Sequence, residues 1–251
     1  MTSLLADSML QPDWPVAPRV RALVTTRYGG VSIGPYASLN LGVAVADEPA
    51  AVAENRARLR TLLPAGPRWL RQVHGTEVVD AAAVAGPVAA DASICTVADV
   101  VCTIQMADCL PVLLASGDAV VAAAHAGWRG LAAGVIESTI ARMDVRPDSV
   151  VAWLGPAIGP DAFEVGEDVR RAFVDHDAGA ATAFRPYPGR DGKWFADIFE
   201  LARRRLRAQG LTAIHGGGIC THGNRTRFFS HRRDGVTGRM AALIWIAGEQ
   251  V

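Results

Sequence analysis

The sequence predicts one domain of mixed α and β structure, in which strands pair as hairpins more often than they alternate with helices. Half of the 251 residues are hydrophobic and 20% are charged, so a large core is available and disorder is not expected. Short β-branched runs are separated by glycine and proline turns, whereas helical periodicity is confined to four segments. We expect residues 19–251 to form this domain and residues 1–18, which contain three prolines, to precede it as an arm.

The expected elements run from residue 19 to residue 247. Strands are predicted in the β-branched run that follows Asp91 and at residues 19–27, 68–74, 76–82, 110–115, 119–124, 149–155, 211–220 and 239–247. Helices are predicted at residues 49–63, 130–143, 166–175 and 195–209. Pro49 suits the first turn of its helix and Gly210 suits the end of the last one. Residues 176–192 show no periodicity and are predicted as a loop.

Composition argues against several classes of protein. The formal net charge is zero, so we expect no nucleic-acid partner. Lys193 is the only lysine, and its surroundings lack the spacing of a P-loop. The four cysteines form no CxxC pair, as expected in a reduced cytoplasm. No basic region precedes an apolar core at the N-terminus and no run reaches about 18 apolar residues, so neither a signal peptide nor a membrane span is predicted.

Residues 105–130 concentrate the side chains that suit chemistry. Two apolar runs flank a short turn, which is typical of an antiparallel hairpin. If the turn is centred on Gly117, Cys109 lies directly opposite His125, with Cβ atoms about 4.5–5.5 Å apart. Arg129 and the start of a predicted helix, which favours anions, follow at the same end. The simpler interpretation of Cys109, as a small core residue, stays open.

A third side chain joins this pair in the predicted arrangement. His74 stands at the end of a predicted strand, before Gly75, where a side chain is aimed out of a sheet edge. Two histidines and one cysteine suit a zinc ion with an open fourth position. The same ligands suit a single copper ion, although Met106 is an unconvincing weak axial ligand. A multicopper oxidase needs more histidines than the six that are present.

Arginines beside glycine-rich or polar loops are candidates for binding an anion. Guanidinium groups make two-pronged contacts to phosphate or carboxylate. Each of these arginines, taken alone, is more often a surface residue than a site residue, so both interpretations stay open. The arginines concerned are Arg27, Arg71, Arg129, Arg232 and Arg233.

Several segments together resemble the YfiH-like family, whose members were long labelled polyphenol oxidase or laccase-domain proteins. The resemblance runs from about residue 20 to the C-terminus, and its most specific pieces are ADCLPV at 107–112 and HAGWRG at 125–130. The other matching pieces are TTR at 25–27, GGVS at 29–32, SLNLG at 38–42, QVHG at 72–75, LGPAIG at 154–159, FFS at 228–230, RRDG at 232–235 and TGR at 237–239.

The resemblance implies a four-layer α/β/β/α fold with mixed sheets, similar to that of cytotoxic necrotizing factor-like deamidases. It also implies a zinc site at His74, Cys109 and His125. Family members are enzymes of purine nucleosides, which they cleave with phosphate or, for adenosine, deaminate. One bacterial branch is linked to peptidoglycan editing. We therefore expect a cytoplasmic monomer or weak homodimer whose partners are purine nucleosides and phosphate.

The main hypothesis is a zinc-dependent purine nucleoside phosphorylase with an adenosine deaminase side activity. The expected catalytic residues are His74, Cys109, Asp108 and His125, and Asp108 or Glu77 is the candidate proton shuttle for deamination. The expected substrate-binding residues are Arg27, Asn40, Arg71, Arg129 and Arg232.

Three alternatives stay open. In a metal-free cysteine hydrolase, Cys109 would be the nucleophile and His125 the base. A factor that binds or edits peptidoglycan precursors is the second alternative, and a copper-dependent phenol oxidase is the third.

Overall fold

Two large sheets form the centre of the fold in the computed structural model, which describes residues 8–249. One sheet is antiparallel with the order β1-β12-β4, and comprises β1 (Val20–Val24), β12 (Met240–Ile246) and β4 (Cys102–Met106). The other is mixed with the order β11-β7-β5-β6-β3-β2, and comprises β11 (Ala213–Gly216), β7 (Val150–Leu154), β5 (Leu110–Ser116), β6 (Val120–Ala126), β3 (Ala92–Cys95) and β2 (Val78–Asp80).

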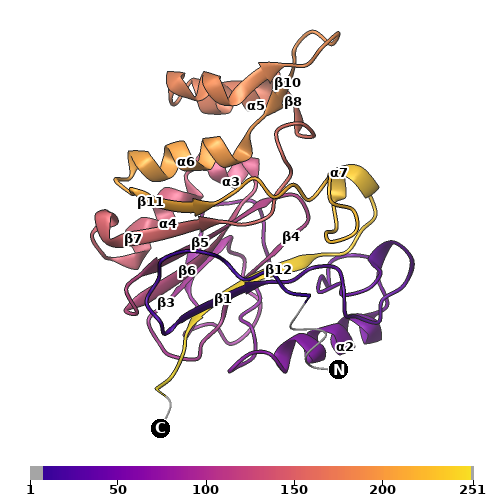
Figure 1. Cartoon of the computed structure of the whole chain (residues 1–251), viewed down its shortest axis with the longest axis vertical. Helices are drawn as coiled ribbons and strands as arrows, with labels where there is room; N and C mark the ends of the chain where they lie inside the picture. Colours follow the sequence, from indigo (N-terminus) through magenta and orange to yellow (C-terminus); the bar gives the residue numbers. More distant parts are fainter. Residues whose placement is uncertain (1–7, 250–251) are drawn as a thin grey trace.

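The helices and sheets stack in four layers (Figure 1), and buried side chains fill the three spaces between them. In β5, Val112 and Leu114 face a core shared with helices, whereas Leu113 and Ala115 face the other large sheet, as the two-residue period of a strand requires. The far face of the three-stranded sheet packs Leu243 against a helix that carries Leu59. The predicted α/β/β/α architecture is therefore confirmed.

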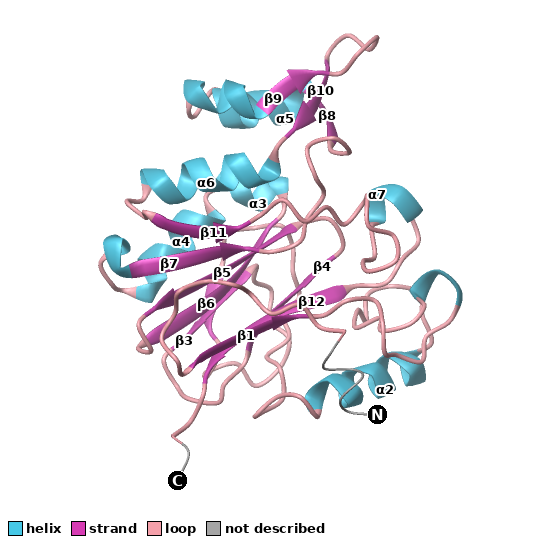
Figure 2. Ribbon diagram, viewed as in Figure 1, coloured by secondary structure: helices cyan, strands magenta, loops and turns pink. Residues whose placement is uncertain are grey.

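Helices cover both outer faces (Figure 2). One helix, α2 (Pro49–Arg60), covers the three-stranded sheet, and the six-stranded sheet is covered by α3 (Trp128–Ala133), α4 (Val135–Met143) and α6 (Ile198–Ala208). A small sheet of β8 (Glu164–Gly166), β10 (Lys193–Ala196) and β9 (Phe184–Pro186) projects beyond them with α5 (Glu167–Val174). The remaining short elements are η1 (Gly34–Tyr36), η2 (Pro147–Ser149), η3 (Ala178–Ala183) and α7 (His231–Asp234).

Three predicted segments differ from the structure. The helix predicted at 130–143 is two helices, because Gly134 adopts φ +104° between them. The helix predicted at 195–209 starts later, since Asp197 accepts hydrogen bonds from the first helical N–H groups and Phe195 belongs to β10. The loop predicted at 176–192 contains η3 and β9.

The N-terminal half also differs from the prediction. Of the strands predicted at 68–74 and 76–82, only β2 forms, and Arg68 and Arg71 make isolated bridges. The first seven residues of the predicted arm lie outside the described residues. In the described part, Leu10 pairs with Val24, and Trp14 packs against the core between the two sheets. No helix within residues 8–249 is long and apolar enough to span a membrane.

The central hairpin forms with a different register from the predicted one. Ser116 pairs with Val120, so the turn has three residues and the ladder places Pro111, not Cys109, opposite His125. Cys109 directly precedes β5 and lies two residues along the chain from Pro111, the residue that pairs with His125. The two side chains still lie on the same side of the hairpin, because a shift of two residues preserves the face of a strand.

Asn55 of α2 holds the loop that precedes the helix. It is completely buried, and its side-chain oxygen accepts a hydrogen bond from the backbone N–H of Val31 at 2.8 Å. Its side-chain nitrogen donates to Ser32 Oγ and to the carbonyls of Ser38 and Asn40 at 2.9–3.1 Å. One amide therefore fixes a segment that has little regular structure of its own.

We expect Asn55→Ala to lower the free energy of unfolding by about 2–4 kcal/mol, because buried partners would lose their hydrogen bonds. Chemical denaturation measures the change. The matched control is Glu54→Ala on the exposed side of α2, where loss of an ion pair with Arg58 should cost less than about 0.5 kcal/mol. Equal effects of the two substitutions would contradict this role of Asn55.

Candidate metal centre

The three predicted ligands lie together where two sheet ends and a turn meet. One ligand atom from each of His74, Cys109 and His125 lies within 4.8 Å of the other two. Cys109 Sγ is 3.7 Å from His74 Nε2, and the two imidazole rings stand edge to face with centroids 4.8 Å apart. His125 is buried, Cys109 is half-buried and His74 is exposed, so the cluster opens toward solvent on one side.

Local backbone conformation brings two of these side chains inward. His74 lies in a turn with φ +60°, not at a strand end as predicted, and Asp108 adopts φ +89° just before Cys109. Both values are uncommon for residues with a Cβ atom, and such conformations persist only where the surroundings hold them. Here the turn at His74 and the turn before β5 are each held by a buried carboxylate.

The first of these carboxylates belongs to Asp91, which the sequence did not identify as a site residue. Asp91 is completely buried, and its Oδ1 lies 2.8 Å from His125 Nδ1. The same carboxylate accepts backbone N–H groups of Val73, His74 and Gly75 at 2.6–3.1 Å. Asp91 therefore orients one ligand directly and positions another through its backbone, leaving Nε2 of His125 free for a metal.

The pKa values of the cluster reflect these contacts. Burial is the largest influence on Cys109 and opposes its ionisation, but the charges of His125 and His74 and the hydrogen bonds from both rings together outweigh it and lower the pKa of the thiol to about 6. Burial also disfavours the imidazolium form of His125, and the charge of Cys109 with the hydrogen bond to Asp91 raises its pKa to about 9. The direction of both shifts favours the thiolate form of Cys109 and the imidazolium form of His125 when no metal ion is bound.

The donor set fits a zinc ion. Tetrahedral zinc with bonds of about 2.0–2.3 Å needs ligand atoms roughly 3.3–3.8 Å apart, close to the Cys109–His74 distance. Two imidazoles, one thiolate and an open side are the ligand pattern of catalytic zinc. Met106, the candidate axial ligand for copper, is buried in the core between the sheets. The cluster can therefore hold a metal and leave a position for a substrate.

The second carboxylate is that of Asp108, a predicted catalytic residue. Its Oδ1 accepts the hydroxyl of Thr221 at 2.6 Å, and its Oδ2 accepts the Ser230 hydroxyl at 3.0 Å and the Arg232 N–H at 2.7 Å. Both oxygens are thus used within the protein. In this arrangement Asp108 fixes the C-terminal segments that carry Thr221, Ser230 and Arg232, which favours a structural role for its carboxylate. Glu77, the other candidate shuttle, is exposed.

The predicted substrate-binding residues are less closely gathered. Arg71 and Arg129 are exposed, and Arg129 stacks on the ring of Trp128 with its Cζ 4.4 Å from the centroid. Arg232 donates to the carbonyl of Glu164 in the projecting sheet. Asn40 is completely buried, so the structure does not offer it to a substrate.

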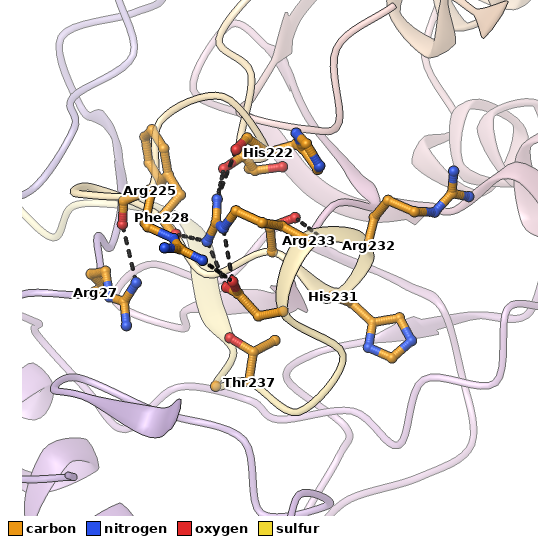
Figure 3. A network of polar contacts seen from close by, with 12 residues as sticks. Arg27, His222, Arg225, Phe228, His231, Arg232, Arg233 and Thr237 are labelled. Carbon is orange, nitrogen blue, oxygen red and sulfur yellow. Dashed lines mark hydrogen bonds and ion pairs between the residues drawn. The ribbon is translucent and has the colours of Figure 1, made fainter. Parts of the chain in front are cut away.

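Arg27 and Arg233 belong to one polar network at the C-terminal loops (Figure 3). Arg27 Nη1 donates to the carbonyl of Arg225 at 3.0 Å, and its Nε donates to Ala37 O at 2.8 Å. Every nitrogen of the Arg233 guanidinium is used, by Asp234 and by the carbonyls of residues 221, 222 and 228. Arg233 therefore holds the loop together and has no donor left for a ligand.

Comparison with known proteins gives consistent matches over nearly the whole chain. The model of a family described as multi-copper polyphenol oxidoreductase laccase matches residues 21–247. A Pseudomonas aeruginosa protein named purine nucleoside phosphorylase is 54% identical over 241 residues, which cover 96% of this chain and 99% of the relative. The Escherichia coli protein named purine nucleoside phosphorylase YfiH is 49% identical over 246 residues, with coverage of 96% and 99%.

The fold is also shared with solved structures. A Neisseria meningitidis protein of 50% sequence identity superimposes with a TM-score of 0.92, covering 96% of this chain and all of that one. YlmD from Geobacillus stearothermophilus superimposes with a TM-score of 0.80 at 31% identity, covering 96% of this chain and 99% of that one.

We expect Asp91→Asn to weaken metal binding about 10- to 100-fold, because an amide cannot replace the carboxylate that orients His125 and the turn at His74. Competition with a chelator measures the affinity. Asp118→Asn, in the turn at the opposite end of the hairpin, is the matched control and should leave the affinity unchanged. Affinity within about twofold of wild type in Asp91→Asn would show that the metal does not depend on this carboxylate.

Gly127 lies so close to His74 and Cys109 that a larger residue there should disturb the cluster. A Cβ atom at this position would lie 2.8 Å from His74 Cδ2 and 3.0 Å from Cys109 Sγ, although its φ of −60° suits any residue. We therefore expect Gly127→Ala to displace a ligand and weaken metal binding at least about tenfold. Gly66→Ala, where no atom lies within 4 Å of the new methyl group, is the control. Equal metal affinity in both variants would refute the steric argument.

Proposed function

Because this chain belongs to the YfiH-like family, whose model is described as a multi-copper polyphenol oxidoreductase laccase, we propose that it is a zinc-dependent purine nucleoside phosphorylase. The observation that carries the proposal is the cluster of His74, Cys109 and His125, oriented by Asp91 and open on one side. Relatives that are 45–54% identical over nearly their whole length are named purine nucleoside phosphorylase. The proposed substrates are adenosine, inosine and methylthioadenosine.

In the proposed reaction, a phosphate oxygen attacks the anomeric carbon of the ribose. The bond from this carbon to the purine nitrogen breaks, and the base leaves with the bonding electrons and takes up a proton. When bound, zinc would supply a Lewis acid at the open side of the cluster. His74, Cys109 and His125 would hold it, and Asp91 would keep the His125 ring in the orientation that presents Nε2.

An adenosine deaminase side activity belongs to the same proposal. Deamination needs a water molecule and a group that moves a proton to the leaving amine. Both oxygens of the Asp108 carboxylate already accept hydrogen bonds within the protein, so we propose that another group carries the proton. We propose deamination as the weaker of the two reactions, because the described residues offer no ready carboxylate for it beside the cluster.

One observation favours a second candidate function, a cysteine hydrolase. The thiol of Cys109 has its pKa lowered to about 6 beside a protonated His125, which is the state of an activated cysteine nucleophile. Asp91 would then be the third member that orients the histidine. A metal ion and a free nucleophile exclude each other here, since zinc would use the same thiolate as a ligand.

The experiment measures metal content together with phosphate-dependent release of free base from the three nucleosides. We expect about one zinc per chain in the wild type, and both zinc and activity lost in Cys109→Ala. The loss in kcat/KM should be at least about 10³-fold, because the substitution removes a ligand of the metal that supports the reaction. Cys95→Ala, a buried cysteine of β3, is the control and should retain both.

The possible results separate the two candidates. Metal-free protein that still releases base would remove zinc from the proposal. Fully zinc-loaded protein without turnover of any nucleoside would refute the phosphorylase. Amide hydrolysis of peptidoglycan precursors by metal-free protein, abolished in Cys109→Ala and by zinc, would establish the cysteine hydrolase.

A further inference from the structure

Arg239 is held in one position by its neighbours. Its backbone N–H donates to Asn40 Oδ1 at 2.8 Å, and its Nη1 donates to the carbonyls of Thr237 and Gly238 at 3.0 Å. Gly42 packs against its stem so closely that a Cβ atom there would lie 2.7 Å from Arg239 Cγ. The side chain is thereby ordered before any ligand arrives.

The sheet register places Arg239 near the cluster of His74, Cys109 and His125. Met240, the first residue of β12, pairs with Met106, the last residue of β4. The next residues along the two antiparallel chains are Arg239 and Ala107, and Ala107 is followed by Asp108 and Cys109. Arg239 therefore lies at the sheet end from which Cys109 enters the cluster.

Electrostatics agree with this placement. Burial lowers the pKa of Arg239, and the negative charge of Cys109 is the largest influence in the opposite direction, followed by that of Asp108. Asp108 has both oxygens engaged elsewhere, and Cys109 is a metal ligand in the proposed function. The guanidinium of Arg239 is half-buried, and within residues 8–249 it forms no ion pair with a carboxylate.

Two nitrogens of Arg239 remain available. Within residues 8–249, its Nε and Nη2 make no hydrogen bond, whereas Nη1 is used twice. These two nitrogens form one edge of the planar guanidinium, the edge that binds two oxygens of a phosphate or carboxylate side by side. By contrast, Arg233 has no free donor, and Arg129 is an exposed residue stacked on Trp128.

We propose that Arg239 binds the phosphate co-substrate beside the cluster of His74, Cys109 and His125. Its Nε and Nη2 would each donate a hydrogen bond to one phosphate oxygen. The proposal rests on the proposed phosphorylase function for the identity of the anion. The proposal also gives Asn40 a different role from the predicted contact with substrate. The buried amide of Asn40 positions Arg239, and Arg239 contacts the phosphate.

Two measurements test the proposal. One is calorimetric titration of inorganic phosphate into the zinc-loaded protein, and the other is the KM for phosphate in the cleavage of inosine. Arg239→Gln should raise both the Kd and the KM for phosphate about 10- to 100-fold, the range expected for losing charge-assisted hydrogen bonds. The KM for inosine and the zinc content should stay within about threefold of wild type. Arg239→Lys should bind phosphate with intermediate affinity, because it retains the charge without the two-pronged contact.

The control is Arg146→Gln, because the side chain of Arg146 is 83% exposed. This substitution should leave the Kd, both KM values and the zinc content unchanged. Unaltered phosphate affinity in zinc-loaded Arg239→Gln overturns the proposal, as does a wild type that binds no phosphate at millimolar concentration. If Arg239→Gln does not fold, unaltered affinity in Arg239→Lys overturns it instead. If the wild type cleaves no nucleoside but loses phosphate binding in Arg239→Gln, the anion site stands and the phosphorylase function fails.

Discussion

The buried carboxylate of Asp91 is the contact on which the candidate site depends. It accepts one hydrogen bond from His125 and three from the backbone at Val73, His74 and Gly75, so a single side chain joins β6 to the turn before β2. Burial would raise the pKa of Asp91, but the hydrogen bond from His125 and the N–H groups of the turn together lower it. The carboxylate therefore stays ionised, and a site assembled from distant segments becomes one rigid unit.

The layered architecture explains why such contacts are needed. His125 belongs to the six-stranded sheet, whereas Arg239 precedes a strand of the three-stranded sheet, and the site forms where the ends of the two sheets meet. Backbone ladders fix each sheet internally but do not fix one sheet relative to the other. The apolar core packed between the two sheets supplies one such link. Asp108 supplies a polar one, because it lies between β4 and β5 and accepts hydrogen bonds from Thr221, Ser230 and Arg232 in the C-terminal part of the chain.

Residue type and strand periodicity were sufficient to predict a mixed α and β domain and to bring His74, Cys109 and His125 together, whereas the four layers were expected only from the resemblance to the YfiH-like family. The register was wrong by two residues, because the three-residue turn is centred on Asp118 and not on Gly117, yet the parity of the strands kept Cys109 and His125 together. Asp91 was missed because its partners are backbone groups and a histidine far along the chain. Arg239 was missed because only the folded protein shows which arginines have unused donors, and no pattern in the sequence carries that information.

The close packing of Gly42 against Arg239 has a consequence for how sequences of this fold can diverge. A methyl group at position 42 would occupy the space of the arginine stem, so a larger residue there is tolerated only if position 239 shortens or its backbone retreats. Substitutions at the two positions should therefore appear as pairs among relatives. In a relative without this arginine, a larger residue could replace the glycine. A larger side chain at position 42 would therefore indicate that the relative binds a different ligand at this place.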